Sequence, residues 1–199
     1  MKTRLSFPFL FCTTLCLLAT QARAAIIDLG TFGGHQYLYD TGSFLTVSAA
    51  DLAGQVQGGQ LVAINSVAES NFLISAITPI ASSQLRTAWI GLTRPTSSDA
   101  FSWTNGEPLT FTNWRAAGQG LPFGEPTNNS GETAGVFYVN DPAVNVSSIP
   151  VGVWADTFPT GGEPFNAIYE VTTSAPEPTS LLFLALGSSL TLVKRRRQL

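Results

Sequence analysis

The chain has 199 residues, a length typical of one domain with extra segments at its ends. Between residues 25 and 175, three arginines stand against twelve acidic residues, so this part carries a net charge of −9 although the whole chain carries −3. A surface this acidic repels nucleic acid and suits hard cations, which excludes a nucleic-acid-binding function.

The N-terminal segment has the parts of a secretory signal peptide in their usual order. Lys2 and Arg4 make the start positive, Leu5–Ala19 is an apolar run, and small residues follow at Ala22 and Ala24. This order predicts a signal peptide over residues 1–24, removed after Ala24 once the export machinery has recognised it. An N-terminal membrane anchor is the alternative, but the apolar run is short for a spanning helix.

Both cysteines of the chain, Cys12 and Cys16, lie inside this N-terminal segment. We therefore expect the mature protein to contain no cysteine and no disulfide. An exported domain without disulfides must be stabilised by its hydrophobic core, by a metal ion, or by both.

The first helix expected within the domain covers residues 47–57. Gly58-Gly59 then ends it. Apolar residues recur in it at the spacing i, i+3, i+4, i+7, which predicts an amphipathic helix with one apolar face. The residues of that face are Ala49, Leu52, Ala53 and Val56.

A short buried strand, residues 61–64, separates this helix from a second one. Ser66 followed three residues later by Glu69 forms a capping box, the pattern that begins a helix. Pro79 ends this helix. Its apolar face consists of Phe72, Leu73, Ala76 and Ile77.

Beyond the second helix the sequence favours short strands and irregular loops. Residues 107–132 are rich in Gly, Pro, Asn and Thr and show no periodicity, and an irregular loop of that length inside a compact domain is usually functional. Two helices followed by strands around such a loop are typical of the α+β class. The segments that we expect to be strands are 88–92, 101–103, 136–139, 151–154 and 167–171.

Residues 174–199 differ in composition from the domain before them. Pro176-Glu177-Pro178 leads into an apolar stretch, Leu181–Val193, and four cations follow at residues 194–197. The stretch is shorter than the roughly 20 residues of a spanning helix, and the cations are expected to stay cytoplasmic and to halt export. We therefore expect transient membrane insertion by a short C-terminal helix, with a simple C-terminal anchor as the alternative.

These three parts resemble the PEP-CTERM sorting signal. In proteins of that kind an exosortase cuts near the Pro-Glu-Pro motif, here Pro176, Glu177 and Pro178. The resemblance implies a protein that is membrane-anchored before processing and lies in the cell envelope, or outside the cell, after it. It also implies a bacterium that makes exopolysaccharide, and so a setting such as a biofilm matrix.

The body of the chain resembles a C-type lectin domain over essentially its whole length. The resemblance implies that residues 25–173 have a C-type-lectin-like fold, with two helices packed on small antiparallel sheets and a long loop region. It places the four tryptophans in the core rather than on a sugar-stacking surface. It rests on the segments 59–64, 69–73, 89–92, 101–108, 111–114, 124–126, 154–156 and 168–170.

The resemblance also implies a calcium and sugar site in the long loop. In the family, a Glu-Pro-Asn motif, a downstream Glu and an Asn-Asp pair supply oxygen ligands, and the same residues hydrogen-bond sugar hydroxyls. Glu125 matches the motif's Glu, and Pro126 matches its proline, which is cis in the family. Thr127 stands in place of the Asn, and Asn128 follows one position later.

The remaining ligands match in part. One acid lies at close to the spacing of the downstream Glu and another matches the Asp of the pair, whose Asn is replaced by Ala155. Three carboxylates carry enough negative charge to hold calcium, although the missing amides remove sugar contacts as well as ligands. The residues predicted to bind both Ca²⁺ and carbohydrate are Glu125, Asn128, Glu132 and Asp156.

These features predict an exported, calcium-assisted carbohydrate-binding protein of the cell surface or of an extracellular polysaccharide matrix. The alternative is a calcium-independent scaffold that binds protein, or stabilises matrix, without recognising sugar. We expect no enzyme, because His35 is the only histidine and the mature chain has no cysteine for a nucleophile-base pair. A glycosidase pair of Glu125 and Glu132 is disfavoured by the loop context and by the family resemblance.

Overall fold

The computed structural model describes residues 25–80, 87–139 and 149–173. The predicted signal peptide with its cleavage site at Ala22 and Ala24, and the predicted sorting signal at Pro176, Glu177 and Pro178, lie outside these residues. The described strands are β1 Ile26–Phe32, β2 His35–Thr46, β3 Gln60–Leu61, β4 Ala88–Thr93, β5 Ser102–Trp103, β6 Ala134–Phe137, β7 Trp154–Thr157 and β8 Thr160–Thr172.

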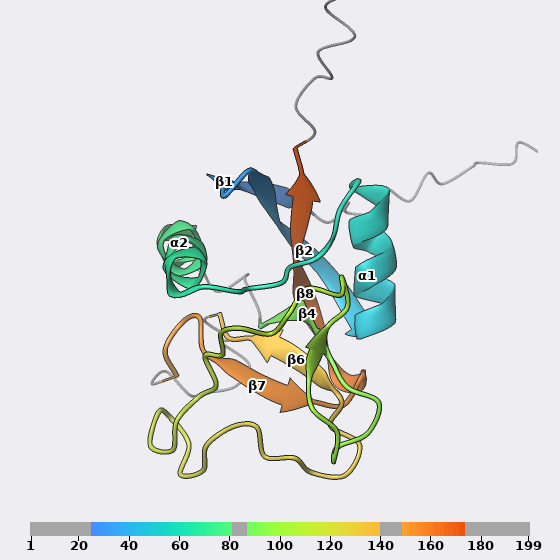
Figure 1. The fold of residues 1–199 in the computed structure, drawn as a ribbon, viewed down its shortest axis with the longest axis vertical. Helices are drawn as coiled ribbons and strands as arrows, with labels where there is room; N and C mark the ends of the chain where they lie inside the picture. The colour runs from blue at the N-terminus through green and yellow to red at the C-terminus, as the bar shows by residue number, and fades with distance from the viewer. Residues whose placement is uncertain (1–24, 81–86, 140–148, 174–199) are drawn as a thin grey trace, which may run out of the picture.

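The described strands form one connected sheet in the order β1-β2-β8-β4-β6-β7, with β3 paired to β8 and β5 paired to β4. Two helices, α1 Val47–Val56 and α2 Val67–Ile77, lie on opposite sides of β2 and β8 (Figure 1). The α+β prediction with two helices is confirmed. The sheet is mixed rather than antiparallel, because β4 runs parallel to β8, with Ala88 opposite Asn166.

Two strands, β1 and β2, precede the helices in the domain. The sequence pattern had instead predicted the helix at residues 47–57 as the first element. β2 lacks the alternation of a half-buried strand, because Tyr37, Leu38, Tyr39 and Asp40 are all buried. Its two faces pack in different core clusters, with Tyr37 and Tyr39 in one and Leu38 in the other. A strand covered on both faces carries no period-2 signal, which explains why the pattern missed it.

α1 forms where it was predicted but buries the opposite face. Leu52 and Val56, expected in the core, are 62% and 83% exposed. Gly54 instead lies against the ring of Tyr169 on β8, where an added Cβ would come within 2.8 Å of Cδ1. Close approach of helix and sheet therefore requires the small side of the helix. The buried residues are Val47, Ala50 and Gly54.

α2 confirms its prediction. The Glu69 backbone N–H donates to Ser66 Oγ at 3.1 Å, as in a capping box, while the Glu69 carboxylate accepts from the Tyr37 hydroxyl at 2.8 Å. Leu73 and Ile77 are fully buried in the core. No helix of the described residues is both long enough and apolar enough to cross a membrane.

Trp89, Trp103 and Trp154 are buried in the core, as predicted, and the partly buried Trp114 packs against it. Trp154 is fully buried, and its ring centroid lies 5.6 Å from that of Trp103, 5.7 Å from that of Phe111 and 5.8 Å from that of Trp114. The strand expected at 151–154 begins only at Trp154, because Gly152 turns the chain with φ +94°. β6, β7 and the long loop thus lie at the end of the molecule away from β1 (Figure 1).

Candidate ligand-binding loop

The long irregular segment between β5 and β6 is tied to the core through its backbone. The Trp154 N–H donates to the Asn113 carbonyl at 2.8 Å, and the Arg115 N–H donates to the Trp154 carbonyl at 2.9 Å. The Glu125 N–H then donates to the Arg115 carbonyl at 2.8 Å. These bonds hold the loop beside β7, the strand that carries Asp156.

Glu125 and Asp156 converge on the backbone of the loop. The peptide bond between Glu125 and Pro126 is cis, as the resemblance implies. The next backbone N–H, of Thr127, lies 2.8 Å from Asp156 Oδ1 and 3.1 Å from Glu125 Oε2. The Asn128 N–H donates to Asp156 Oδ2 at 3.0 Å. One buried carboxylate on β7 thus fixes two consecutive amides of the loop.

Glu132 closes the other side of the loop through neutral donors. Its Oε2 accepts from the Thr127 hydroxyl at 2.6 Å and from the Asn129 N–H at 3.1 Å. The Asn129 side chain in turn donates to Thr127 Oγ1 at 2.9 Å. Thr127, which departs from the expected Asn, therefore links the loop's acids through its hydroxyl and its backbone.

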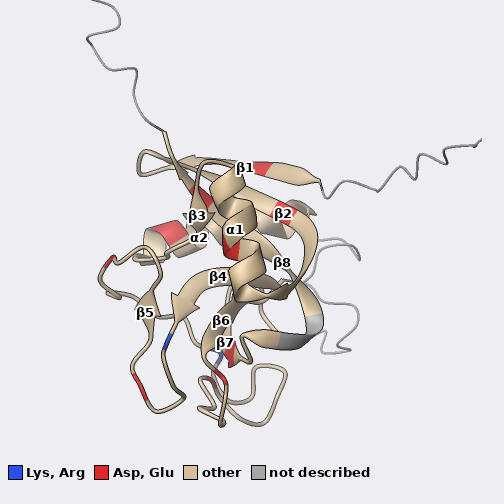
Figure 2. Cartoon of the chain, turned by 90° about the vertical axis from the view of Figure 1, so that its right-hand side faces the viewer, with Lys and Arg blue, Asp and Glu red and all other residues tan. Residues whose placement is uncertain are grey.

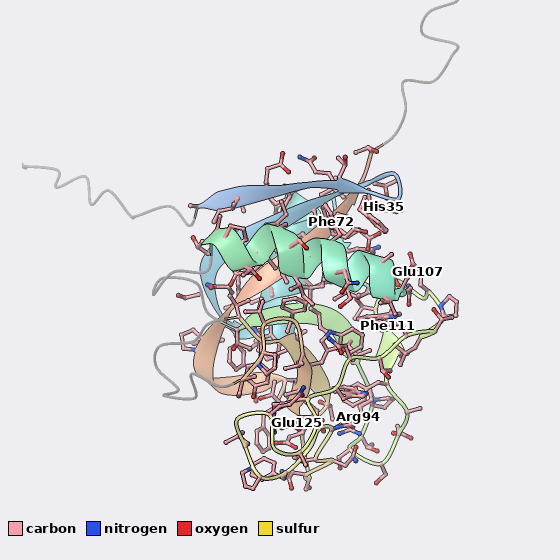
Figure 3. All side chains as sticks on the ribbon, turned by 90° about the vertical axis from the view of Figure 1, so that its left-hand side faces the viewer. His35, Phe72, Arg94, Glu107, Phe111 and Glu125 are labelled. Atoms are coloured by element: carbon pink, nitrogen blue, oxygen red, sulfur yellow. The ribbon has the colours of Figure 1, made fainter. Side chains whose placement is uncertain are left out.

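Arg94 enters the same group of side chains from the residue just after β4. Its Nη2 lies 2.7 Å from Asp156 Oδ2, and its Nη1 lies 2.6 Å from Asn128 Oδ1. Nε and Nη2 also donate to the Glu132 carbonyl at 2.9 and 2.7 Å. Figure 3 shows Arg94 and Glu125 at the loop end of the molecule, away from His35.

Arg115 holds the second acid of the loop. It is fully buried, and its Nη2 lies 2.7 Å from Glu125 Oε1. Its Nη1 donates to the Phe123 carbonyl at 2.7 Å. Figure 2 shows blue only in this half of the described chain; of the Lys and Arg residues that the structure describes, both lie in this loop region. The two arginines that the structure describes are therefore each paired with a carboxylate of this loop region, Arg94 with Asp156 and Arg115 with Glu125.

Burial shapes the acidity of Glu125. Desolvation raises the pKa of its carboxyl to about 6, the neighbouring Asp156 carboxylate raises it as well, and Arg115 lowers it. The carboxyl therefore takes up a proton at a higher pH than an exposed glutamate does.

The structure brings together all four predicted site residues, which come from the loop and from β7. Arg94 and Arg115 are two of the three arginines counted between residues 25 and 175, and the sequence pattern predicted no role for them. Their rarity in an acidic domain was the one available signal. Nothing in their spacing indicates which acid each of them reaches, because the partners lie 62 and 10 positions away.

The side chains present do not fit a calcium ion as they stand. Calcium takes roughly six to eight oxygen ligands around one point. Both oxygens of Asp156 and both of Glu125 already accept hydrogen bonds from arginine or backbone N–H groups. Across residues 25–80, 87–139 and 149–173, no three Asp, Glu, His or Cys side chains are grouped so that they could hold a metal.

Two phenyl rings stand exposed on the loop region. Phe123 is 52% exposed, and the Arg115 guanidinium carbon lies 5.4 Å from its ring centroid. Phe158, just after β7, is 49% exposed and lies against Gly131, where an added Cβ would be 3.0 Å from Cε1. Exposed aromatic rings beside polar loop residues suit ligands that have both an apolar face and hydroxyl groups.

A second acidic group lines a cavity of about 170 Å³ near the other end of the molecule. Glu170 on β8 lies 2.7 Å from His35 Nδ1, and burial raises the pKa of its carboxyl. Glu69 and Glu107 line the same cavity, but both accept hydrogen bonds from protein donors. These contacts join β2, α2 and β8, so we assign the group to the stability of the fold.

Comparison with known proteins identifies the family. The model of the "Lectin C-type domain" matches residues 44–146, just over half of the chain. The C-type lectin lectoxin-Lio1 of Erythrolamprus poecilogyrus is 34% identical over 74 residues, covering 37% of this chain and 40% of that protein. The chain covers less than half the length of the curated relatives that it matches.

Solved structures show the same fold. Human lithostathine superposes with a TM-score of 0.56 at 20% identity, over 72% of this chain and 95% of its own. The cow carbohydrate-recognition domain of CD23, solved in the presence of a GlcNAc2Man3 oligosaccharide, gives 0.54 at 24% identity over 76% and 95%. C-type lectin domains are non-enzymatic sugar-binding proteins that often bind calcium, which confirms that the chain is no enzyme. The chain belongs to the C-type lectin domain family.

Proposed function

We propose that the chain is an exported carbohydrate-binding protein that holds its ligand on the surface formed by residues 123–132 and 156–158. The observation that carries this proposal is the exposed ring of Phe158 beside the polar side chains of the loop. Sugars combine apolar C–H faces with hydroxyl groups, so they match a ring flanked by amides and a carboxylate.

The polar part of this surface is ready to hydrogen-bond a sugar. Asn128 and Asn129 are exposed, and both follow the cis peptide bond in a segment fixed by Asp156 and Glu132. Groups that are held before the ligand arrives lose less conformational entropy on binding. The proposed carbohydrate site therefore keeps Glu125, Asn128, Glu132 and Asp156, with the acids placing the amides.

Replacing Phe158 by serine tests the site. Stacking on an aromatic ring contributes about 0.5–1.5 kcal/mol beyond burial of area, so we expect binding of a polysaccharide or an arrayed glycan to weaken roughly 2- to 13-fold. The full chain would be screened against bacterial exopolysaccharides and glycans, and the best ligand titrated by calorimetry. The melting temperature should stay within about 2 °C, because the ring is half exposed.

The matched control is Leu52→Ser. Leu52 is 62% exposed on α1, far along the chain from the loop, and it is equally apolar. This variant should bind the same glycan as the parent does. Equal losses in both variants, or no loss at Phe158, would remove the proposed surface as the binding site.

A scaffold function without sugar recognition is the second candidate. It is favoured by the pairing of Glu125 and Asp156 with arginines, because paired carboxylates have fewer free lone pairs for sugar hydroxyls. In that case the glycan screen described above would give no ligand at all.

Export and C-terminal processing complete the proposal. Their support is the order of charged, apolar and small residues over 1–24, and of Pro-Glu-Pro, apolar and basic residues over 174–199. The protein would be membrane-anchored before an exosortase acts and would reach the envelope or an exopolysaccharide matrix afterwards. Intact mass of the protein recovered outside the cells should show an N-terminus at Ala25 and a C-terminus near Pro176–Pro178. A cell-bound product that retains residues 194–197 would contradict the processing step.

A further inference from the structure

Arg94 lies at the centre of the residues that were expected to bind calcium. Its side chain is 2% exposed, and that of its partner Asp156 is fully buried. The backbone of Arg94 is fixed too, since its N–H donates to the Thr133 carbonyl at 3.0 Å. A buried cation with a fixed backbone is part of the folded core and not a side chain that rests on the surface.

The atoms that Arg94 contacts come from three of the four residues nominated for the metal. They are Asn128 Oδ1, Asp156 Oδ2 and the Glu132 carbonyl oxygen, at 2.6–2.9 Å from guanidinium nitrogens. A guanidinium offers five N–H donors in one plane, so one group can join oxygens from separate parts of the chain. Calcium performs the same task with its coordination sphere.

The ring of Phe101 fixes the guanidinium from another side. The Arg94 Cζ lies 4.1 Å from the centroid of Phe101, and Phe101 packs against Trp114 at 5.1 Å between ring centroids. A cation over an aromatic face is attracted by the ring quadrupole, and more strongly where water is excluded. The fold therefore provides a place shaped for this arginine, with the core on one side and the loop's oxygens on the other.

Charge makes the arginine and a metal ion mutually exclusive. A divalent ion at Asp156 would stand within a few ångströms of the guanidinium, where like charges repel strongly because little water screens them. Arg115 meanwhile pairs with Glu125 at 2.7 Å. Asp156 and Glu125 are therefore both paired with an arginine. Among the described residues, the Glu132 carboxylate accepts hydrogen bonds from uncharged donors, the Thr127 hydroxyl and the Asn129 N–H.

We propose that Arg94 is a built-in cation that takes the place of calcium in this loop, so that the loop keeps its shape and binds carbohydrate without a metal ion. The inference rests on the proposed function for its carbohydrate part. Arg94 is a positioning residue in it: it acts by holding Asn128 and Asp156 in place.

Two measurements on the unaltered full chain test it first. Titration with CaCl2 should give no saturable heat up to about 5 mM, a range in which extracellular calcium modules saturate. The melting temperature should be the same in about 5 mM calcium and in EDTA, whereas a protein that binds calcium would gain several degrees. Saturable binding that is lost in Asp156→Ala would overturn the proposal.

The response of the Arg94→Ala variant to calcium separates the proposed role from a purely structural one, because only an arginine that replaces an ion should leave a calcium-binding site when it is removed. We expect the melting temperature of this variant in EDTA to fall by about 10 °C, because Asp156 loses its partner, and calcium to restore several degrees with saturable binding. Arg94→Lys keeps the positive charge but loses the planar guanidinium and its several donors. We expect this variant to be less stable than the parent and its melting temperature not to change with calcium. Arg94→Ala combined with Asp156→Ala should also not respond.

The outcomes separate this inference from the proposed function. Glycan binding that survives EDTA supports both, and glycan binding that EDTA abolishes overturns the inference but keeps the proposed function. A chain that binds no glycan in either condition removes the proposed function, while the calcium titrations still decide the role of Arg94. If the Arg94→Ala chain folds but neither binds calcium nor gains melting temperature in its presence, the arginine does not take the place of an ion. If that variant does not fold, the titration of the unaltered chain decides.

Discussion

Replacing Trp154 by alanine is expected to lower the free energy of unfolding by about 3–5 kcal/mol, the range for large buried aromatic residues. Trp154 is fully buried and packs edge-to-face against Trp103, Phe111 and Trp114. Its backbone also forms the bridge that ties Trp114 and the long loop to β7. Urea unfolding followed by tryptophan fluorescence and by circular dichroism would measure the loss.

Trp154→Phe is the matched variant. The indole Nε1 is buried and has no hydrogen-bond partner in the described part of the chain, so phenylalanine removes ring area without breaking a hydrogen bond. We expect a cost of about 1–2 kcal/mol for this variant. Equal costs for alanine and phenylalanine would contradict a role based on packing and would point to the indole nitrogen.

The fold could be predicted largely because its motifs act locally. Ser66 and Glu69 begin α2 through contacts three residues apart, and Leu73 and Ile77 face the core as their spacing requires. The face of α1 could not be predicted in this way. Leu52 and Val56 lie on the solvent side, because the close packing that only Gly54 allows is set by Tyr169, more than a hundred residues away.

The candidate site shows the same division. The positions of Glu125 and Asp156, and the cis peptide bond, follow from a resemblance in sequence order. What neutralises these acids depends on tertiary contacts: Arg94 reaches Asp156 across 62 residues. A carboxylate beside a loop looks the same in sequence whether an ion or an arginine pairs with it, so the sequence could predict the acids but not their cation.

Arg115→Met should destabilise the protein by about 3–5 kcal/mol at pH 7.5, because it removes one partner of a buried ion pair. Glu125 would then be left in the interior with only the Thr127 N–H, and the Phe123 carbonyl would lose its donor. Chemical denaturation of the parent and the variant at several pH values would measure the difference.

The pH dependence distinguishes a lost charge pair from lost packing. The pKa of Glu125 in the folded protein is about 6, above its ordinary value of 4.5, and removal of Arg115 must raise it further. The folded state therefore binds the Glu125 proton more tightly than the unfolded state does. The free energy of unfolding consequently falls as the pH rises from the unfolded-state pKa of 4.5 through the folded-state pKa. The cost of Arg115→Met should be greatest near pH 7.5 and smaller by on the order of 1–2 kcal/mol at pH 5.

The double variant Arg115→Met with Glu125→Gln completes the argument. Because both charges of the Arg115–Glu125 pair are then absent, it should be more stable at pH 7.5 than Arg115→Met alone, and its stability relative to the parent should vary little between pH 6 and 8. A pH-independent cost in the single variant, together with a double variant that is no more stable, would mean that Arg115 acts through the volume it fills. A pH-dependent cost in the single variant and a more stable double variant would instead show that ion pairing holds the loop. Arg115 would then neutralise Glu125 in the same way as Arg94 neutralises Asp156.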